Sequence, residues 1–184
     1  MADLEIQAIE LSEPYAVEPP EGATGEPIER VSVRIDARNT SPDTTLHAIS
    51  EARRIQFDEA TGTLFLGLSD PPPEETPEIF HQFAPAQTPV LPNETATLEV
   101  SVPRVIRLLR VGEGEGLSGI AYDEVDMSQV RRVECEVAYA DTPFRRAPDQ
   151  SAREMNRELS ERTTTTRVEL PVRLGRRADR KGAQ

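Results

Sequence analysis

The segment ATLEVSV, residues 96–102, shows most clearly the pattern from which the fold class can be predicted. Its apolar residues occupy the even positions and alternate with Thr97, Glu99 and Ser101. Side chains of a β-strand point alternately to its two faces, so this pattern predicts a strand with one buried face and one solvent-facing face.

The same alternation recurs along the chain. It is found at residues 31–37, 64–68, 133–139 and 168–174, and in a shorter form at 55–57. Seven or eight such strands, with at most one or two short helices, predict an all-β protein built as an antiparallel β-sandwich. Near the N-terminus, the apolar residues Leu4, Ile6 and Ala8 occupy even positions, whereas the next one, Ile9, occupies an odd position. This change predicts a bulge in the strand or a crossing between sheets.

The segment LPNETATLEVSVP, Leu91–Pro103, resembles a strand of an immunoglobulin-like domain. That resemblance implies a fold and no particular function, because such folds carry many functions. Asp58–Gly62 predicts a hairpin turn with Gly62 in the left-handed conformation. Two longer connections, at residues 69–77 and 112–119, are rich in proline and glycine respectively.

Helices are predicted at two places at most. Val105–Leu109 fits one or two helical turns or, equally, a strand. Asp149–Glu161 fits a helix capped by Asp149, with an apolar face of Ala152, Met155 and Leu159. We therefore divide the chain into a sandwich at 1–148 and, at 149–184, a helix, an edge strand and a basic tail. This second part is an extension of the same domain or an inter-subunit arm.

The composition argues against a membrane-spanning protein and a secreted protein. The 184 residues carry a net charge of −12, one cysteine and two histidines, and 20 of the 21 basic residues are arginine. No run of 18 apolar residues predicts a membrane helix, and the first residues do not resemble a secretory signal. These features predict a protein of the cytoplasm or of a virus-like particle.

Charge is unevenly distributed between the two halves. Residues 1–99 hold 19 acidic and 5 basic side chains, whereas residues 100–184 hold 14 acidic and 16 basic ones. The Arg-rich end predicts contact with an acidic partner or with copies of the same chain, and otherwise only nonspecific nucleic-acid binding. The alternative is a solvated tail. The predicted interaction residues are Arg173, Arg176, Arg177, Arg180 and Lys181.

No motif predicts catalysis or a cofactor. Cys135 lies on the apolar face of a predicted strand, and His47 and His81 lack further ligands at zinc spacing. The acidic residues Asp123, Glu124 and Asp126 suit a solvated loop better than a calcium site. The arginine doublets at 53–54, 131–132, 145–146 and 176–177 are expected to pair with the chain's own carboxylates, within or between subunits.

These observations predict a non-enzymatic structural or assembly subunit that acts through protein–protein contacts. The alternative is a ligand-binding module that takes a peptide, a carbohydrate or calcium at its end loops, residues 69–79 and 112–127. An enzyme would need a pair of carboxylates that the fold brings together, and the sequence does not identify such a pair.

Overall fold

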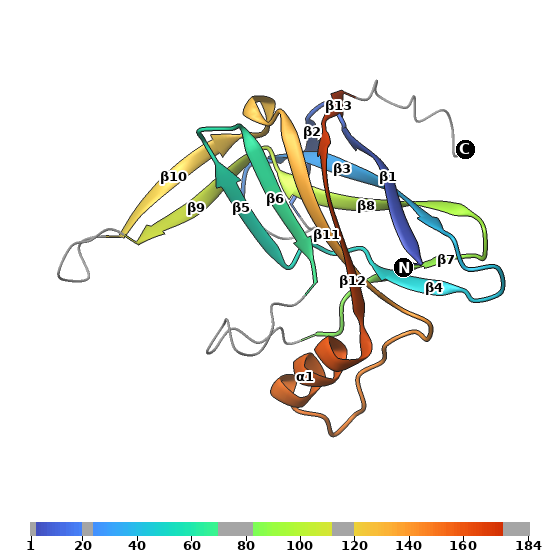
Figure 1. The fold of residues 1–184 in the computed structure, drawn as a ribbon. Helices are drawn as coiled ribbons and strands as arrows, with labels where there is room; N and C mark the ends of the chain where they lie inside the picture. The colour runs from blue at the N-terminus through green and yellow to red at the C-terminus, as the bar shows by residue number, and fades with distance from the viewer. Residues whose placement is uncertain (1–2, 20–23, 70–82, 112–119, 175–184) are drawn as a thin grey trace, which may run out of the picture.

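The computed structural model describes residues 3–19, 24–69, 83–111 and 120–174, and these residues form mostly β-structure (Figure 1). The prediction of an all-β protein is confirmed. The described residues contain thirteen strands instead of seven or eight. The additional strands include very short ones, such as Tyr15–Val17 and Arg173–Leu174, which are too short for an alternating pattern to identify.

The first sheet is organised around a long central strand. β3 (Ile28–Asn39) pairs antiparallel with β8 along one edge and with β1 and then β2 along the other. A short parallel strand, β13, extends the sheet beyond β1. The remaining strands are β1 (Leu4–Leu11), β2 (Tyr15–Val17), β8 (Thr95–Pro103) and β13 (Arg173–Leu174).

The second sheet is organised around β11 (Arg132–Ala140). One edge of β11 pairs with β6 and then β4, and the other edge pairs with β12. The β6 pairing is parallel, as is that of β13, so the sheets are not purely antiparallel. The remaining strands are β4 (Leu46–Ile49), β5 (Arg54–Asp58), β6 (Thr63–Leu68), β7 (Gln87–Val90) and β12 (Thr164–Pro171).

A separate two-stranded hairpin consists of β9 (Val105–Val111) and β10 (Ile120–Asp126). Figure 1 shows this hairpin extending to one side of the two larger sheets. The helical alternative for Val105–Leu109 is therefore wrong, because the segment continues β8 after a bend at Arg104 and pairs with β10. A short 3-10 turn, η2 (Met127–Gln129), follows the hairpin.

The hydrophobic core contains side chains from both larger sheets. The alternation seen in the sequence accounts for it, since Leu98, Val100 and Val102 of β8 are buried together with Val133 and Cys135 of β11. Fully buried large side chains also include Leu4, Ile9, Ile35, Ile49, Leu64, Leu66, Leu68, Met155 and Leu159. Within the described residues, none of the helices is both long and apolar enough to span a bilayer.

The helix α1 spans Ala152–Arg162 and adds Met155 and Leu159 to the core, as its apolar face predicted. The predicted cap is wrong. Ser151, not Asp149, is the N-cap, because its hydroxyl accepts from the N–H of Glu154 while the Glu154 carboxylate accepts from the N–H of Ser151. This reciprocal capping box is formed by Glu or Gln three residues after the cap, a position that Glu154 occupies.

Two local predictions are confirmed. The pairing of β1 with β3 shifts register between Ile6 and Ala8, which is the predicted bulge. Gly62 has a φ of 68° in the connection between β5 and β6, as the hairpin turn requires.

Residues 149–174 pack on the rest of the same chain. β12 pairs with β11 at the edge of the second sheet, and β13 then pairs with β1 of the first sheet. The strand thus passes from one sheet to the other, with the Val172 N–H donating to the Arg131 carbonyl over 3.0 Å. Pro171 ends β12 and lies at this edge, in agreement with the predicted edge position.

Candidate functional site

A row of alternating charges crosses four strands of the first sheet on its outer face. Arg173 of β13 lies opposite Glu10 of β1, Glu10 opposite Arg34 of β3, and Arg34 opposite Glu99 of β8. The inward neighbours of these residues, such as Ile9 and Ile35, are buried in the core. The alternation of the strands therefore directs all four charged side chains to the outside.

The charges of this row are only weakly paired with each other. The closest pair, Arg34 Nε and Glu99 Oε1, is 4.0 Å apart. Neither Glu10 nor Arg173 forms an ion pair with any described residue. Arg173 is exposed, and the next residue, Leu174, has 84% of its surface exposed. Among the described residues, one end of the row, Arg173, thus has no ion-pair partner, and the other end, Glu99, has only a weak one.

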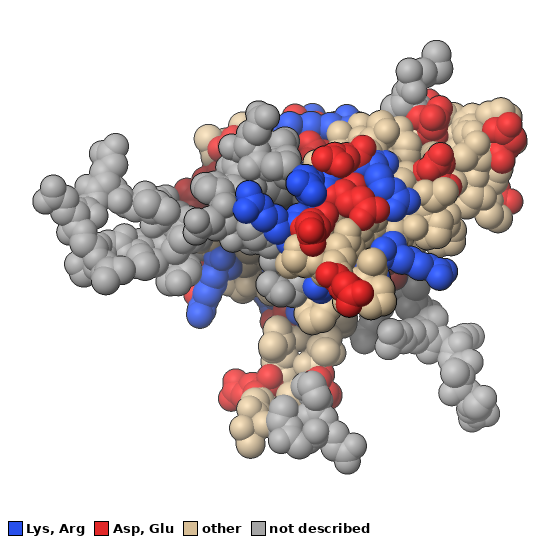
Figure 2. All heavy atoms as spheres, turned by 90° about the horizontal axis from the view of Figure 1, so that it is seen from below, with Lys and Arg blue, Asp and Glu red and all other residues tan. Residues whose placement is uncertain are grey.

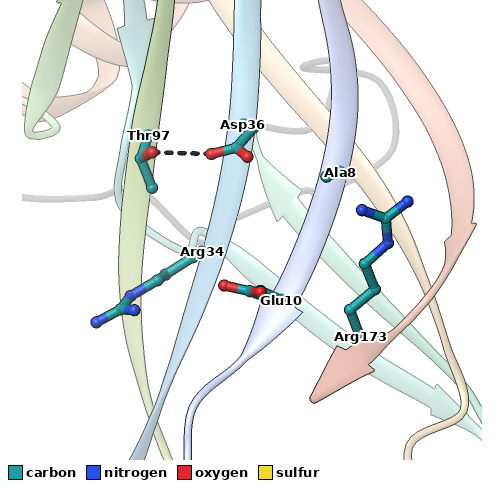
Figure 3. Close-up of a pocket in the computed structure, with 6 residues that line it drawn as sticks. All are labelled: Ala8, Glu10, Arg34, Asp36, Thr97 and Arg173. Carbon is teal, nitrogen blue, oxygen red and sulfur yellow. Dashed lines mark hydrogen bonds between the residues drawn. The ribbon is translucent and has the colours of Figure 1, made fainter. Parts of the chain in front are cut away.

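A shallow pocket of about 290 Å³ lies on this face (Figure 3). Glu10 extends between Arg34 and the strand that carries Arg173, and the Arg173 guanidinium lies toward Ala8. On the neighbouring row, the Thr97 hydroxyl donates to Asp36 Oδ1 over 2.8 Å. The lining residues are Ala8, Glu10, Arg34, Asp36, Thr97 and Arg173.

Hydroxyl groups and one arginine form a cluster farther along the same face. Arg30 donates from Nε to the Ser101 hydroxyl and from Nη2 to the Ser101 carbonyl, each over 2.7 Å. The Tyr15 hydroxyl lies 2.8 Å from the Ser101 hydroxyl and accepts from Ser32 over 3.3 Å. Burial raises the pKa of Tyr15, but these hydrogen bonds and the charge of Arg30 outweigh it, so the pKa is lowered overall.

The outer face of the second sheet differs because its charges are matched. Arg54 pairs with Glu136 over 2.5 Å, and the same Glu136 oxygen accepts from the Ser69 hydroxyl. The guanidinium groups of Arg54 and Arg167 both lie over the Phe65 ring, at 5.2 and 5.3 Å from its centroid. This network occupies the charges of its own face, so the less paired first sheet is the stronger candidate for contacts.

Two arginines from the doublets pair with carboxylates of the same chain, as predicted. They are Arg54 with Glu136 and Arg132 with Glu169. On α1, Arg162 pairs with Glu158 over 2.9 Å. Figure 2, viewed from the side of α1, shows basic and acidic side chains next to one another. The two signs of charge are thus interspersed on this face.

The side chains considered for catalysis or metal binding show no arrangement for either role within the described residues. Cys135 is buried, and burial, together with the nearby charge of Glu136, raises its pKa to about 12. His47 lies in β4, and His81 lies outside the described residues. Glu124 and Asp126 lie on a strand instead of the expected loop, and they pair with Arg107 and Arg104. The described residues contain no group of three or more His, Cys, Asp or Glu placed to hold a metal ion.

One of the interaction residues predicted from the sequence lies on the outer face of the first sheet. Arg173 lies in β13, whereas Arg176, Arg177, Arg180 and Lys181 lie outside the described residues. So do residues 70–79 and 112–119 of the two predicted binding loops. Glu10, Arg34 and Glu99 were not among the interaction residues predicted from the sequence. Their outward positions on predicted strands were a signal, but the sequence does not give the register that aligns them.

Comparison with known proteins finds no matching family model, no matching curated protein and no matching solved structure.

Proposed function

We propose that this chain is a non-enzymatic structural or assembly subunit that acts through protein–protein contacts. The observation that carries the proposal is the charge row on the outer face of the first sheet. Its ends are Arg173, which has no ion-pair partner among the described residues, and the weakly paired Glu99. Charges of opposite sign on a partner would match those of this row, and complementary charges favour the correct partner and speed its association.

The contact surface that we propose includes the Arg-rich end of the chain. Arg173 is its described part, and Arg176, Arg177, Arg180 and Lys181 follow it in the sequence. Guanidinium groups bind carboxylates in a two-pronged geometry, and the net charge of −12 makes copies of this chain, or another acidic protein, suitable partners. The cytoplasm or a virus-like particle is the setting that we propose.

The fold that we propose for this role is an immunoglobulin-like β-sandwich. A buried cluster that draws side chains from both larger sheets supports it. The parallel pairs β1–β13 and β6–β11 and the separate hairpin β9–β10 are departures from the simplest form of such a sandwich.

Size-exclusion chromatography of a native extract, with antibody detection of the chain, tests the proposed function. We expect the chain to elute as a species larger than its monomer at physiological salt. The variant Arg173→Glu is expected to shift elution toward the monomer. Arg107→Glu is the matched control, because it makes the same change of charge at an exposed arginine of β9. A wild-type chain that elutes only as a monomer contradicts the proposal.

A ligand-binding module is the second candidate, and the pocket on the first sheet is the observation that favours it. Acidic and basic side chains line this pocket together, which suits a peptide carrying both charges better than a sugar or a calcium ion. Thermal melting with calcium, with a disaccharide or with a short mixed-charge peptide tests this candidate. A rise in melting temperature with the peptide that Arg34→Ala abolishes would support it.

A further inference from the structure

The strand β8 is an open edge of the first sheet. Among the strands in the described residues it pairs only with β3. The Asn39 N–H donates to the Glu94 carbonyl and the Arg104 N–H to the Glu29 carbonyl, so the even-numbered residues between them direct their backbone groups toward β3. The backbone N–H and C=O groups of Thr95, Thr97, Glu99 and Ser101 therefore point away from β3, and the Ser101 carbonyl also accepts from Arg30 Nη2 over 2.7 Å.

This edge lacks several of the features that keep sheet edges apart. Lysine, bulges and inward-pointing charges normally prevent edge-to-edge pairing. β8 has nine residues and a regular register with β3, and its inward side chains Leu98, Val100 and Val102 are apolar and buried. The only proline of this strand, Pro103, is at its end. A long, regular edge of this kind favours the addition of another strand.

Two charged groups at this edge, the Arg30 guanidinium and the Glu99 carboxylate, do not form an ion pair with each other. The Arg30 guanidinium reaches across to Ser101 on β8, and no described carboxylate forms an ion pair with it. Glu99 lies two residues before Ser101, and its nearest guanidinium is that of Arg34 at 4.0 Å. A carboxylate placed opposite Ser101 would meet the Arg30 guanidinium, because directly opposed side chains are about 5 Å apart.

We infer that two copies of this chain pair through their β8 edges, antiparallel about a two-fold axis, with Glu99 of each copy opposite Ser101 of the other. In this register each Glu99 carboxylate meets the partner subunit's Arg30, and the contact occurs twice because a two-fold interface is self-complementary. The register that opposes Glu99 to Glu99 is disfavoured by like-charge repulsion. This inference rests on the proposed function and names its partner as a second copy.

Charge reversal in purified protein tests the pairing. Sedimentation velocity over a series of concentrations is expected to show a wild-type dimer. Glu99→Arg and Arg30→Glu are each expected to raise the dimer dissociation constant about tenfold or more, because each creates two like-charge contacts. A mixture of the two variants is expected to form a heterodimer. In it, the arginine introduced at position 99 of one copy faces the glutamate introduced at position 30 of the other. The second contact is the original one between Glu99 and Arg30. Circular dichroism of each variant checks that the fold is retained.

The matched controls are Glu124→Arg and Arg107→Glu, an exposed ion pair of the hairpin at which the same changes of charge are made. They are expected to leave the dissociation constant within about twofold of wild type, because they change the charge away from β8. Failure of the mixed variants to associate overturns the inference, as does an equal effect of the controls or a wild-type chain that stays monomeric. A monomeric purified chain that is part of a large species in the native extract overturns only the β8 pairing and leaves the proposed function standing.

Discussion

The backbone N–H of Asp3 donates to the Tyr139 hydroxyl over 3.1 Å and so joins the start of β1 in the first sheet to β11 in the second. Tyr139 is 4% exposed, so its ring belongs to the core while its hydroxyl acts as a hydrogen-bond acceptor between the sheets. Residues 136 positions apart in the sequence are thereby connected.

Removal of this hydroxyl by Tyr139→Phe is expected to lower the free energy of unfolding by about 1 kcal/mol, because one partly buried hydrogen bond is lost and the ring remains. Urea denaturation measures the change. Tyr15→Phe is the matched control, since its hydroxyl bonds lie on an exposed face and its loss is expected to cost less. No measurable loss for Tyr139→Phe would show that the link between the sheets is unimportant.

Asn39 is fully buried and its side chain makes three hydrogen bonds. Its Nδ2 donates to the carbonyls of Thr44 and Val90 over 2.7 and 2.9 Å, and its Oδ1 accepts from the Ser41 N–H. Asn39→Ala is expected to cost about 2–3 kcal/mol, because buried backbone groups lose their partners. Asn93→Gly serves as the control. Its φ of 61° suits glycine, so a similar loss there in a denaturation experiment would contradict this explanation.

The pair Arg54–Glu136 is more buried than the pair Arg107–Glu124, with side chains 24% and 17% exposed against 73% and 57%. Glu136→Gln is expected to destabilise the fold by about 1–2 kcal/mol, because it leaves the Arg54 charge partly buried without its counter-ion. Glu124→Gln is expected to change stability by less than about 0.5 kcal/mol. Chemical denaturation of both variants compares them, and equal losses would rule out burial as the reason.

The Cys135 thiol is expected not to react in the folded protein. Its burial raises its pKa to about 12, so almost none of it is thiolate at the pH of a standard thiol assay. A chromogenic disulfide reagent is expected to label the chain only after unfolding in guanidinium. Rapid labelling of the native chain would indicate an accessible, activated thiol and would weaken the proposal of a non-enzymatic role.

The capping box of α1 predicts a pH dependence. Hydrogen bonds from the Ser151 side chain and backbone lower the pKa of Glu154. A carboxyl group with a lowered folded-state pKa stabilises the fold above its unfolded-state pKa, about 4.3, and loses this contribution as the pH falls through the folded-state value. The melting-temperature advantage of wild type over Glu154→Gln is therefore expected near neutral pH and lost in acid. A difference that does not vary with pH would contradict this assignment.

Local features of the fold could be predicted from the sequence. The alternation around Leu98 and Val133 predicted which side chains are buried, because a strand shows its two faces to different surroundings. The parity change at Ala8 predicted a bulge, and Gly62 predicted a left-handed turn residue. Each of these depends on neighbours within a few positions in the chain. At the start of α1 the sequence-based prediction was wrong, because it placed the cap at Asp149 instead of Ser151.

Alternation of apolar and polar residues was enough to predict strands with Glu10, Arg34 and Glu99 on their polar sides. The row that these side chains form with Arg173 follows from the strand pairing of the folded chain. The difference lies in the register of the strands. Strands distant in the sequence are aligned by packing of the whole core and by backbone hydrogen bonds, and a shift of two residues would keep every side chain on its face while giving it different neighbours.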